Sequence, residues 1–519
     1  MGYKKTILQK LKLGALTVLV LNFSPALVAG EKENRIINKA VEAYGGDKLM
    51  QLKSLKLTDN MNQFTIGQSG HAAQGPMVMQ LSHNKIEITM DLLNRGKTFK
   101  RATTRIVGSQ GTDKPTVAHQ IFVDDKGYVV DHGLQQYRHV KSINYDNVDA
   151  GFGQLLDPMI IRQLTSERNN SRWADTAYIQ GQAHDVLTVN TGTTQEYSVY
   201  LNQKNGYLTR LIKKRGQTIR SYDFIGHQQA QGITWAKQLF VSTAEQPLYH
   251  IDSRQLSFNS AQNYQFNIPS NYKQRQRPQF FDASQLTIRQ VAKDVYFVGQ
   301  DWGYTLFIDA GDYYISAGSW QENSDSHAWQ QGVTLLKTTT GKDKPVRQHI
   351  VSHHHTDHMM GLSDIVELGA DLVIHPTNIA AVKKHLQLPL TDNRFVAIEG
   401  VSYLADGKVM LFDVPNSHAS HNLVIYLPED KLLFTEDFYG SSFQTDLPSP
   451  NGWPSVDTYH RLDVLTSTIN QLALEVEQYL SSHHARILNQ AEIDEAMILS
   501  RPSKAELIKR LFDEKSDVN

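Results

Sequence analysis

Residues His353-His354-His355-Thr356-Asp357-His358 decide the fold of the second half of this chain. The apolar run Ile350-Val351-Ser352 before them is typical of a strand, and the segment from Leu362 to Leu368 after them is typical of a helix. Imidazoles and a carboxylate concentrated in so short a stretch are costly to bury without partners. The stretch therefore indicates a metal site at a strand-to-helix turn.

The spacing of these side chains allows two metal ions to bind side by side. In an extended turn, His353 and His355 point to the same side and can reach one ion. Asp357 and His358 follow where the chain begins to turn, and they can reach a second ion beside the first. Imidazole and carboxylate are ligands that suit zinc, iron and manganese.

Three further candidate ligands follow in chain order. His418 lies in Asn416-Ser417-His418-Ala419-Ser420-His421, immediately before an expected strand. Asp437 follows the apolar run Leu432-Leu433-Phe434, and His483 follows Tyr479-Leu480-Ser481-Ser482. Strands and helices alternate through this region, which predicts layered sheets flanked by helices.

This ordered set closely resembles the metallo-β-lactamase superfamily, over roughly residues 285 to 500. His353-x-His355-x-Asp357-His358 resembles the family signature, and Met359-Met360-Gly361-Leu362 resembles the helix start after it. Leu433-Phe434-Thr435-Glu436-Asp437 resembles a later motif. The resemblance implies an α/β fold for this half, an αββα sandwich.

The resemblance also implies a role for each ligand. The ligands of one metal would be His353, His355 and His418. The ligands of the other would be Asp357, His358 and His483, with Asp437 bridging the two. The implied cofactors are two divalent ions, in the first place Zn²⁺, with iron or manganese as alternatives.

Three positions depart from the family pattern. Glu436 stands where a glycine usually precedes the bridging aspartate. His484 stands where a glycine usually follows the last histidine, so His483 and His484 compete as the last ligand, and His483 fits the family spacing better. Ser316 stands where many members place an aspartate beside the ligands.

The expected function is that of an exported dinuclear hydrolase, using a metal-bridging hydroxide on an ester, lactone, thioester, phosphodiester or sulfate ester. The carboxylate of Asp437 favours these branches over antibiotic hydrolysis, where cysteine or serine usually stands. Asp357 is expected to orient the nucleophile, and His421 to donate to the oxyanion or leaving group, or to be a hydrogen-bond partner behind the ligands. His354 is expected to face outward.

Two other functions fit parts of the pattern. A mononuclear iron dioxygenase of the same fold shares much of the signature. A periplasmic lipid-binding or ligand-binding protein with a vestigial metal site would put the function in the N-terminal half, although the intact ligand set counts against it. The expected partner is a small-molecule substrate, with an apolar or lipid-like one as an option. The sequence names neither the substrate nor the oligomeric state.

Residues 1–30 have the order of a secretory signal peptide. Lys4, Lys5, Lys10 and Lys12 give a basic start, the apolar run from Leu13 to Phe23 follows, and small residues end at Gly30. The chain has no cysteine, which suits an oxidising compartment and excludes thiolate ligands. We therefore expect a periplasmic or secreted protein with no stable membrane span once the leader is removed. The formal net charge of -1, without long blocks of one sign, argues against nucleic-acid binding.

Residues 31–265 predict a mostly antiparallel β domain that begins with a helix. Tyr197, Val199 and Leu201 alternate toward one face, Asn205-Gly206 marks a tight turn, and alternation resumes from Tyr207. The region weakly resembles the half-barrel of bacterial lipoprotein carriers in Ala43-Tyr44-Gly45-Gly46, Val199-Tyr200-Leu201 and Gly232-Ile233-Thr234-Trp235. It would either bind an apolar ligand or pack against the second domain.

The remaining boundaries follow from composition. Residues 266–284 are polar and carry Pro269 and Pro278, which predicts a linker. Residues 285–500 form the expected metallo-β-lactamase-fold domain, and residues 501–519 a charged C-terminal tail. Because every candidate ligand lies between His353 and His483, we expect all catalytic groups to lie in the second domain.

Overall fold

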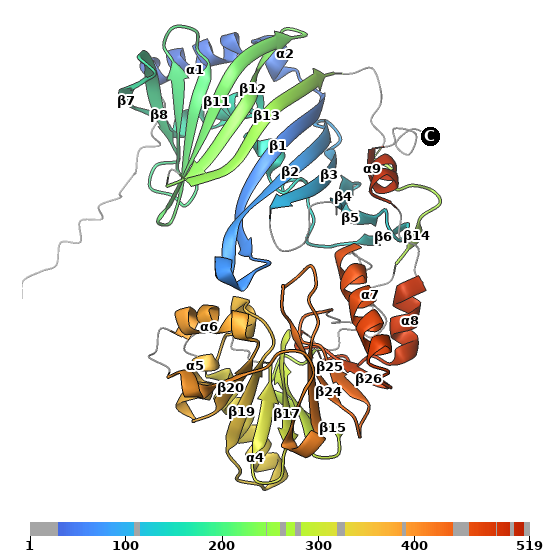
Figure 1. Ribbon diagram of the computed structural model, residues 1–519. Helices are drawn as coiled ribbons and strands as arrows, with labels where there is room; N and C mark the ends of the chain where they lie inside the picture. The colour runs from blue at the N-terminus through green and yellow to red at the C-terminus, as the bar shows by residue number, and fades with distance from the viewer. Residues whose placement is uncertain are drawn as a thin grey trace, which may run out of the picture.

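The computed structural model describes residues 30–107, 115–244, 246–259, 266–275, 282–318, 327–386, 391–439, 456–483, 485–498 and 503–512. They form a large curved sheet in the N-terminal half and a layered sandwich in the C-terminal half (Figure 1). The expected leader lies almost entirely outside the described residues. None of the helices in these ranges is long and apolar enough to cross a membrane.

The N-terminal half is one fourteen-stranded sheet within the described residues, in the order β14-β6-β5-β4-β3-β2-β1-β13-β12-β11-β10-β9-β8-β7. Neighbouring strands are antiparallel except β14 and β6, which confirms the expected antiparallel domain. The expected turn at Asn205-Gly206 joins β9 to β10, and Gly206 has a φ of 78°, which glycine adopts without strain. The strands are β1 (Ser54–Gln68), β2 (Met77–Asp91), β3 (Gly96–Val107), β4 (Pro115–Val123), β5 (Lys126–Asp131), β6 (Gln136–His139), β7 (Ser171–Ile179), β8 (Gln182–Val189), β9 (Tyr197–Asn202), β10 (Leu208–Arg215), β11 (Thr218–Ala230), β12 (Ile233–Thr243), β13 (Gln246–Phe258) and β14 (Lys273–Gln274).

Helices fill one face of this sheet. α1 (Glu31–Ala43) and α3 (Asp157–Ser166) bury apolar side chains against alternate residues of the strands, and α2 (Asp47–Met50) follows α1. Leu55, Leu57 and Met61 of β1 belong to this core. The even-numbered residues of β1 therefore face away from it, because side chains alternate along a strand.

The C-terminal half consists of two sheets, one of seven and one of five strands within the described residues. The first contains β15 (Thr287–Ala292), β16 (Val295–Gln300), β17 (Gly303–Asp309), β18 (Tyr314–Ala317), β19 (Val346–Val351), β20 (Asp371–Ile374) and β21 (Phe395–Ala397). The second contains β22 (Ser402–Leu404), β23 (Val409–Asp413), β24 (Leu423–Leu427), β25 (Leu432–Phe434) and β26 (Gln478–Leu480).

Three apolar clusters hold this half together in four layers. One cluster joins the facing sides of the two sheets, through residues such as Leu306 and Ile425. A second packs α4 (Ala328–Thr340), α5 (Leu362–Glu367) and α6 (Ile379–Leu386) on the first sheet. A third packs α7 (Val456–Gln471) and α8 (Gln490–Ile498) on the second sheet. The expected αββα sandwich is therefore confirmed.

Two segments that the sequence places outside the domains take part in the N-terminal half. In the expected linker, β14 pairs with β6, and Tyr272 is buried in a small apolar cluster. In the expected tail, α9 (Lys504–Phe512) buries Leu507 and Leu511 and contacts β3 and β4. Helix α9 thus lies beside strands of the first domain (Figure 1).

Among the described residues, strands β1 and β2 extend beyond their neighbours as a two-stranded hairpin, which we call the arm (residues 64–81). The last β1–β13 pair is Gln63↔Tyr249, and β2 pairs with β3 as far as Leu81↔Val107. The arm reaches the C-terminal sandwich, where the short helix η1 (Ala72–Gln74) at its tip contacts α6 and η5 (Pro376–Asn378) (Figure 1). Because an isolated two-stranded hairpin is only marginally stable, these contacts hold the arm in place.

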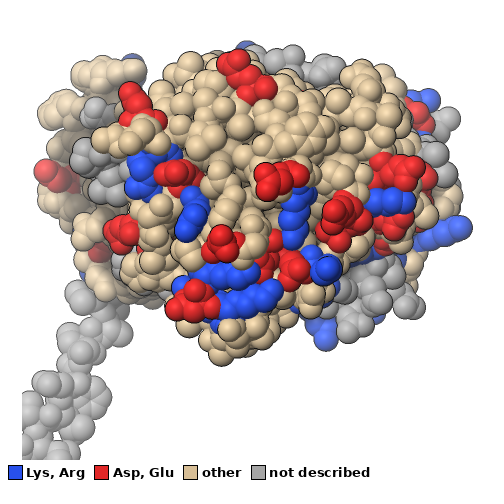
Figure 2. Space-filling view, turned by 60° about the horizontal axis from the view of Figure 1, so that its bottom comes forward, with Lys and Arg blue, Asp and Glu red and all other residues tan. Residues whose placement is uncertain are grey.

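The opposite end of the sandwich carries charges of both signs. Figure 2 shows Lys and Arg side chains interspersed with Asp and Glu over this surface. Lys342 pairs with Asp294 and Asp309, and Lys344 also pairs with Asp309. The arm and the charged end lie at opposite ends of the C-terminal half.

Candidate metal centre

Strand ends at one edge of the sandwich position the candidate ligands. His353 follows the end of β19, and the 3-10 turn η4 (Thr356–His358) then carries the next ligands. β25 and β26 are parallel neighbours, and Asp437 and His483 each come shortly after one of them. The carboxyl ends of parallel strands meet at the same edge, so side chains distant in sequence converge there.

A first group of ligand atoms comes from His353, His355, His418 and Asp437. Nδ1 of His355 lies 3.1 Å from Nε2 of His353 and 2.8 Å from Nε2 of His418, and the two Nε2 atoms are 3.2 Å apart. Oδ2 of Asp437 lies 2.6 Å from Nε2 of His418. The three histidines are almost completely buried.

The chemistry of this donor set fits a cation. Nε2 of His355 lies 2.6 Å from the carbonyl oxygen of Ser69, which can only accept a hydrogen bond. The proton of the neutral ring is therefore on Nε2, and the lone pair of Nδ1 points at the other ligands. The nitrogen spacings are close to the ~3.3 Å expected between two ligands of a tetrahedral zinc ion. The residues present therefore suit a divalent metal.

A second group comes from Asp357, His358, Asp437 and His483. Nε2 of His358 lies 3.7 Å from Oδ2 of Asp357 and 3.5 Å from Oδ2 of Asp437. Nε2 of His483 lies 3.3 Å from Oδ1 of Asp437 and 3.7 Å from Oδ2 of Asp357. All seven side chains predicted as ligands thus lie in two adjacent groups, and Asp437 belongs to both.

The two groups differ in electrostatics. In the first, burial and the neighbouring His358 lower the pKa of His353 well below its usual value, and burial and His418 lower that of His355 to about 3. These imidazoles are held neutral, the form that binds metal. In the second, burial alone would lower the pKa of His358, but Asp357, Asp437 and Glu436 raise it well above its usual value.

The pKa values of the carboxylates in the second group are lowered. Burial would raise the pKa of Asp437, but His418 and His483 hold it well below its usual value. Burial would also raise the pKa of Asp357, but the neighbouring His358 holds it below its usual value. Both carboxylates are therefore ionised, and ionised carboxylates are the form that ligates a cation.

Polar groups behind the ligands orient them. Oε2 of Glu436 lies 2.9 Å from Nδ1 of His358 and directs Nε2 of that ring toward the second group. Glu436 has a φ of 55°, the left-handed region that favours glycine, which explains why a glycine usually stands here. Oγ of Ser352 lies 2.8 Å from Nδ1 of the ligand His353. Oγ of Ser316 is hydrogen-bonded to His349, which is not one of the candidate ligands.

The arm of the N-terminal half completes this shell. Nε2 of Gln68 donates a hydrogen bond of 2.9 Å to Oδ1 of Asp357, and the carbonyl of Ser69 accepts one from His355. The backbone nitrogen of Ser420 donates to the carbonyl of Gly70 at 2.8 Å. The sequence-based view of a site built only from the second half missed these groups.

His354 is also part of this contact. The ring is fully buried, and its Nε2 lies 2.8 Å from Oγ of Ser69. The expectation that His354 faces outward is wrong, because the tip of the arm covers it. No ligand spacing in the sequence signals this contact.

His421 lies in a separate group with His375 and Asp413. Its Nδ1 bonds to Oδ2 of Asp413 at 2.8 Å, and its ring stacks on His375 with centroids 3.7 Å apart. A catalytic role for His421 stays a prediction. His484, the alternative to His483, lies outside the described residues.

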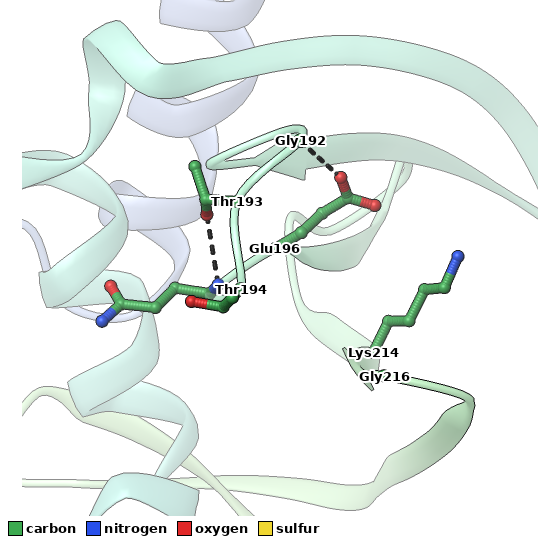
Figure 3. A pocket seen from close by; sticks show the side chains of 7 residues that line it. Gly192, Thr193, Thr194, Glu196, Lys214 and Gly216 are labelled. Atoms are coloured by element: carbon green, nitrogen blue, oxygen red, sulfur yellow. Dashed lines mark hydrogen bonds between the residues drawn. The ribbon is translucent and has the colours of Figure 1, made fainter.

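The N-terminal sheet carries a hollow of about 750 Å³ between the β8–β9 loop and the β10–β11 turn (Figure 3). Glu196 accepts a hydrogen bond from the backbone of Gly192, and Thr193 accepts one from the backbone of Gln195. These polar groups are engaged in closing the loop, so the hollow is a consequence of the loop's shape.

Sequence comparison finds a family match within the C-terminal half. Residues 289–483 match the metallo-beta-lactamase superfamily. The domain therefore has the fold of metal-dependent hydrolases, and its His and Asp groups suit divalent metal binding. A comparison with curated protein sequences finds no match.

Solved structures of metallo-β-lactamases are similar to this half. The mono-zinc form of FIM-1 from Pseudomonas aeruginosa is 18% identical with a TM-score of 0.34, and the match covers 43% of this chain and 98% of that one. The enzyme from Pontibacter korlensis is 17% identical, with a TM-score of 0.33, covering 41% and 98%. The enzyme from Hirschia baltica is 16% identical, with a TM-score of 0.32, covering 42% and 98%.

Proposed function

We propose that this protein is an exported hydrolase that uses two divalent metal ions, in the first place zinc, to cleave an ester, lactone, thioester, phosphodiester or sulfate ester. One observation carries the proposal. The two groups of ligand atoms share Asp437, whose Oδ2 lies beside His418 of the first group and whose Oδ1 lies beside His483 of the second. A carboxylate that belongs to both ligand groups is suited to hold two cations side by side.

Two divalent cations bound there would supply Lewis acidity for activating water and polarising the scissile group. The net reaction adds the hydroxyl of water to the carbonyl carbon, phosphorus or sulfur, and a proton leaves with the departing group. Asp357 can hold the attacking water, because Oδ1 is fixed by Gln68 while Oδ2 faces the second group. Gln68 is then a positioning residue that keeps Asp357 in one orientation.

Metal analysis and a substrate panel test the proposal. We expect full-length protein produced with metal supplementation to retain close to two transition-metal ions and to cleave at least one of the five substrate classes. Asp357→Ala should retain the fold but lose nearly all turnover. A metal content near zero, or a variant that keeps most of its activity, would contradict the proposal. A single iron with oxygen consumption would favour the dioxygenase alternative.

Two variants test the last ligand. His483→Ala should lose the second metal, because Nε2 of His483 faces both Asp437 and Asp357. His484→Ala should retain both metals. The reverse outcome would assign the role to His484.

Export is proposed from the leader alone. Lys4 to Lys12 give the basic start and Leu13 to Phe23 the apolar core. Expression with the native N-terminus should yield a mature protein that begins after Ala29 or Gly30 in the periplasm or medium. An uncleaved protein in the cytosolic fraction would refute export.

A further inference from the structure

The outer face of the β1–β2 hairpin changes character where the arm leaves the sheet. Side chains directly opposite each other on antiparallel strands share a face, so the register defines this face along both strands. In the part anchored in the sheet the face is polar, and it carries Lys56, Thr58, Asn60, Asn62, His83, Lys85 and Glu87. In the arm it is apolar, and it carries Phe64, Ile66, Met77, Met79 and Leu81. We call these five side chains the apolar strip.

The middle of the apolar strip is in contact with solvent. Ile66 is 62% exposed, and its cross-strand partner Met79 and the adjacent Met77 are each 43% exposed. Phe64 and its partner Leu81 are half-buried. Nothing about a solvated β-ribbon requires large apolar side chains here, and the same face is polar further along the same two strands.

The apolar strip leads directly to the candidate metal centre. Gln68 is paired with Met77 and lies on the same face, one step beyond Ile66. Its amide holds Asp357 at 2.9 Å. From Gln68 back to Phe64 the strand covers roughly 13 Å, on the order of ten methylene groups. A molecule with its reactive group at Asp357 can therefore lay an apolar chain along the apolar strip.

The size of the apolar strip favours a substrate chain over a protein partner. Stable protein interfaces bury about 800 Å² on each side, more than five partly buried side chains on a two-stranded ribbon provide. A linear chain a few ångströms wide matches a ribbon of this width. Methionines add to the fit, because their flexible thioethers adapt to different chains.

We propose that the substrate of this hydrolase carries a linear apolar chain, an acyl or alkyl chain of about six to twelve carbons, that binds along the apolar strip while its scissile group lies at Asp357. This inference rests on the proposed function for the reactive group only. The N-terminal half thereby selects the substrate of a site whose ligands lie in the C-terminal half.

Binding of fatty acids separates this proposal from the hydrolase reaction. Calorimetric titration of metal-loaded full-length protein with hexanoate, octanoate, decanoate and dodecanoate, each below its micelle concentration, should give affinities that rise with chain length. Each added methylene should increase the affinity by at most about fourfold, which corresponds to roughly 0.8 kcal/mol per buried CH₂. Ile66→Ser and Met79→Ser should flatten this dependence, so that the loss of affinity relative to wild type grows from hexanoate to dodecanoate.

Ile225→Ser is the matched control, because Ile225 is a 48% exposed isoleucine on β11 of the same sheet. It should leave the chain-length dependence unchanged. Circular dichroism and thermal unfolding check that all three variants fold. Equal chain-length slopes in wild type and the arm variants would overturn the proposal, as would affinities that do not change with chain length.

The failure of this proposal and that of the proposed function are distinguishable. Hydrolysis whose kcat/KM does not depend on chain length would leave the hydrolase standing and overturn the role of the apolar strip. Arm-dependent fatty-acid binding in a protein that hydrolyses nothing would support the apolar strip and refute the hydrolase. If Ile66→Ser reduces binding to phosphatidylglycerol vesicles but not the chain-length slope, the apolar strip contacts a membrane and the proposal is wrong.

Discussion

Gln68 and Asp357 are joined by a hydrogen bond of 2.9 Å from the amide nitrogen to Oδ1, across 289 residues of sequence. The bond links the N-terminal arm to a side chain that belongs to the second group of candidate ligands. Because it occupies one carboxylate oxygen, the other oxygen is left directed at His358 and His483. The two halves of the chain therefore share one site.

Gln68→Ala should lower kcat about tenfold or more while leaving the metal content unchanged, because Asp357 loses the group that fixes its orientation. Gln68→Glu should lower kcat further, since the carboxylate that it introduces is repelled by the carboxylate of Asp357. Gln74→Ala, at an exposed position of the same arm tip, is the control and should behave as wild type. Equal turnover in Gln68→Ala and Gln74→Ala would refute the positioning role.

The tip of the arm should also raise metal affinity. Replacing Ser69–Pro76 by Asn-Gly keeps the Gln68↔Met77 pair but removes the carbonyl that accepts from Nε2 of His355. Loss of such a partner behind a metal ligand typically weakens binding by about 10–100-fold. Competition with a chelator measures this affinity.

Ser69→Ala is the contrasting variant, because it keeps the carbonyl and removes only the hydroxyl beside His354. It should bind metal within about threefold of wild type and lose on the order of 1 kcal/mol of stability. If both variants bind metal as tightly as wild type, the carbonyl of Ser69 does not orient His355.

The C-terminal half could be predicted in detail because its signals are local. The ligands lie in short motifs beside apolar strands, and the family resemblance orders them along the chain. The role of Gln68 could not be predicted in this way, since no local pattern links a glutamine in a β-ribbon to an aspartate so far away. The change from Asn62 to Phe64 on one strand face was the available signal, because it interrupts a polar alternation.

The end of the chain shows the same limit. The spacing of Leu507 and Leu511 places both on one face of a helix. The charged composition of residues 501–519 nevertheless predicts a solvent-exposed tail, because the sequence does not show which surface that face packs against. The surface is β3 and β4 of the other domain, which a reading of local composition does not supply. His354 was misjudged for the same reason, because the arm that buries it comes from the first half.

Asp157 should make the stability of the N-terminal half depend on pH. Burial raises its pKa to about 6, although Arg254 and Tyr44 act in the opposite direction. Between the unfolded value of about 4 and this value, the folded protein holds a proton that the unfolded chain has released. Stability therefore falls as pH rises through this window, by roughly 2–3 kcal/mol.

Asp157→Asn should remove this contribution. His227, whose pKa burial lowers to about 4, acts in the opposite sense, so the difference between variant and wild type is the quantity to measure. Urea unfolding at pH 4 and pH 7 should show the variant gaining stability relative to wild type by roughly 2–3 kcal/mol over this interval. Parallel pH profiles of the two proteins would show that Asp157 is ionised throughout.

Glu436 combines a strained backbone with an oriented ligand. Its φ of 55° costs a residue other than glycine about 1 kcal/mol, and its carboxylate lies 2.9 Å from Nδ1 of His358. Glycine would remove the strain, but it would also remove the acceptor and add freedom to the unfolded chain. The backbone and the ligand therefore favour different residues at this position.

The free energy of unfolding of Glu436→Gly should therefore lie within about 1 kcal/mol of the wild-type value. The variant should nevertheless bind the second metal about 10–100-fold more weakly and lose turnover. Glu436→Gln keeps an oxygen that can accept from Nδ1 of His358, so it should retain most of the metal affinity that glycine loses. Chelator competition and thermal unfolding measure the two effects separately. If the glycine variant holds two metals as tightly as the glutamine variant, the carboxylate of Glu436 is not needed to orient His358, and its presence at a strained position has no explanation in the metal centre.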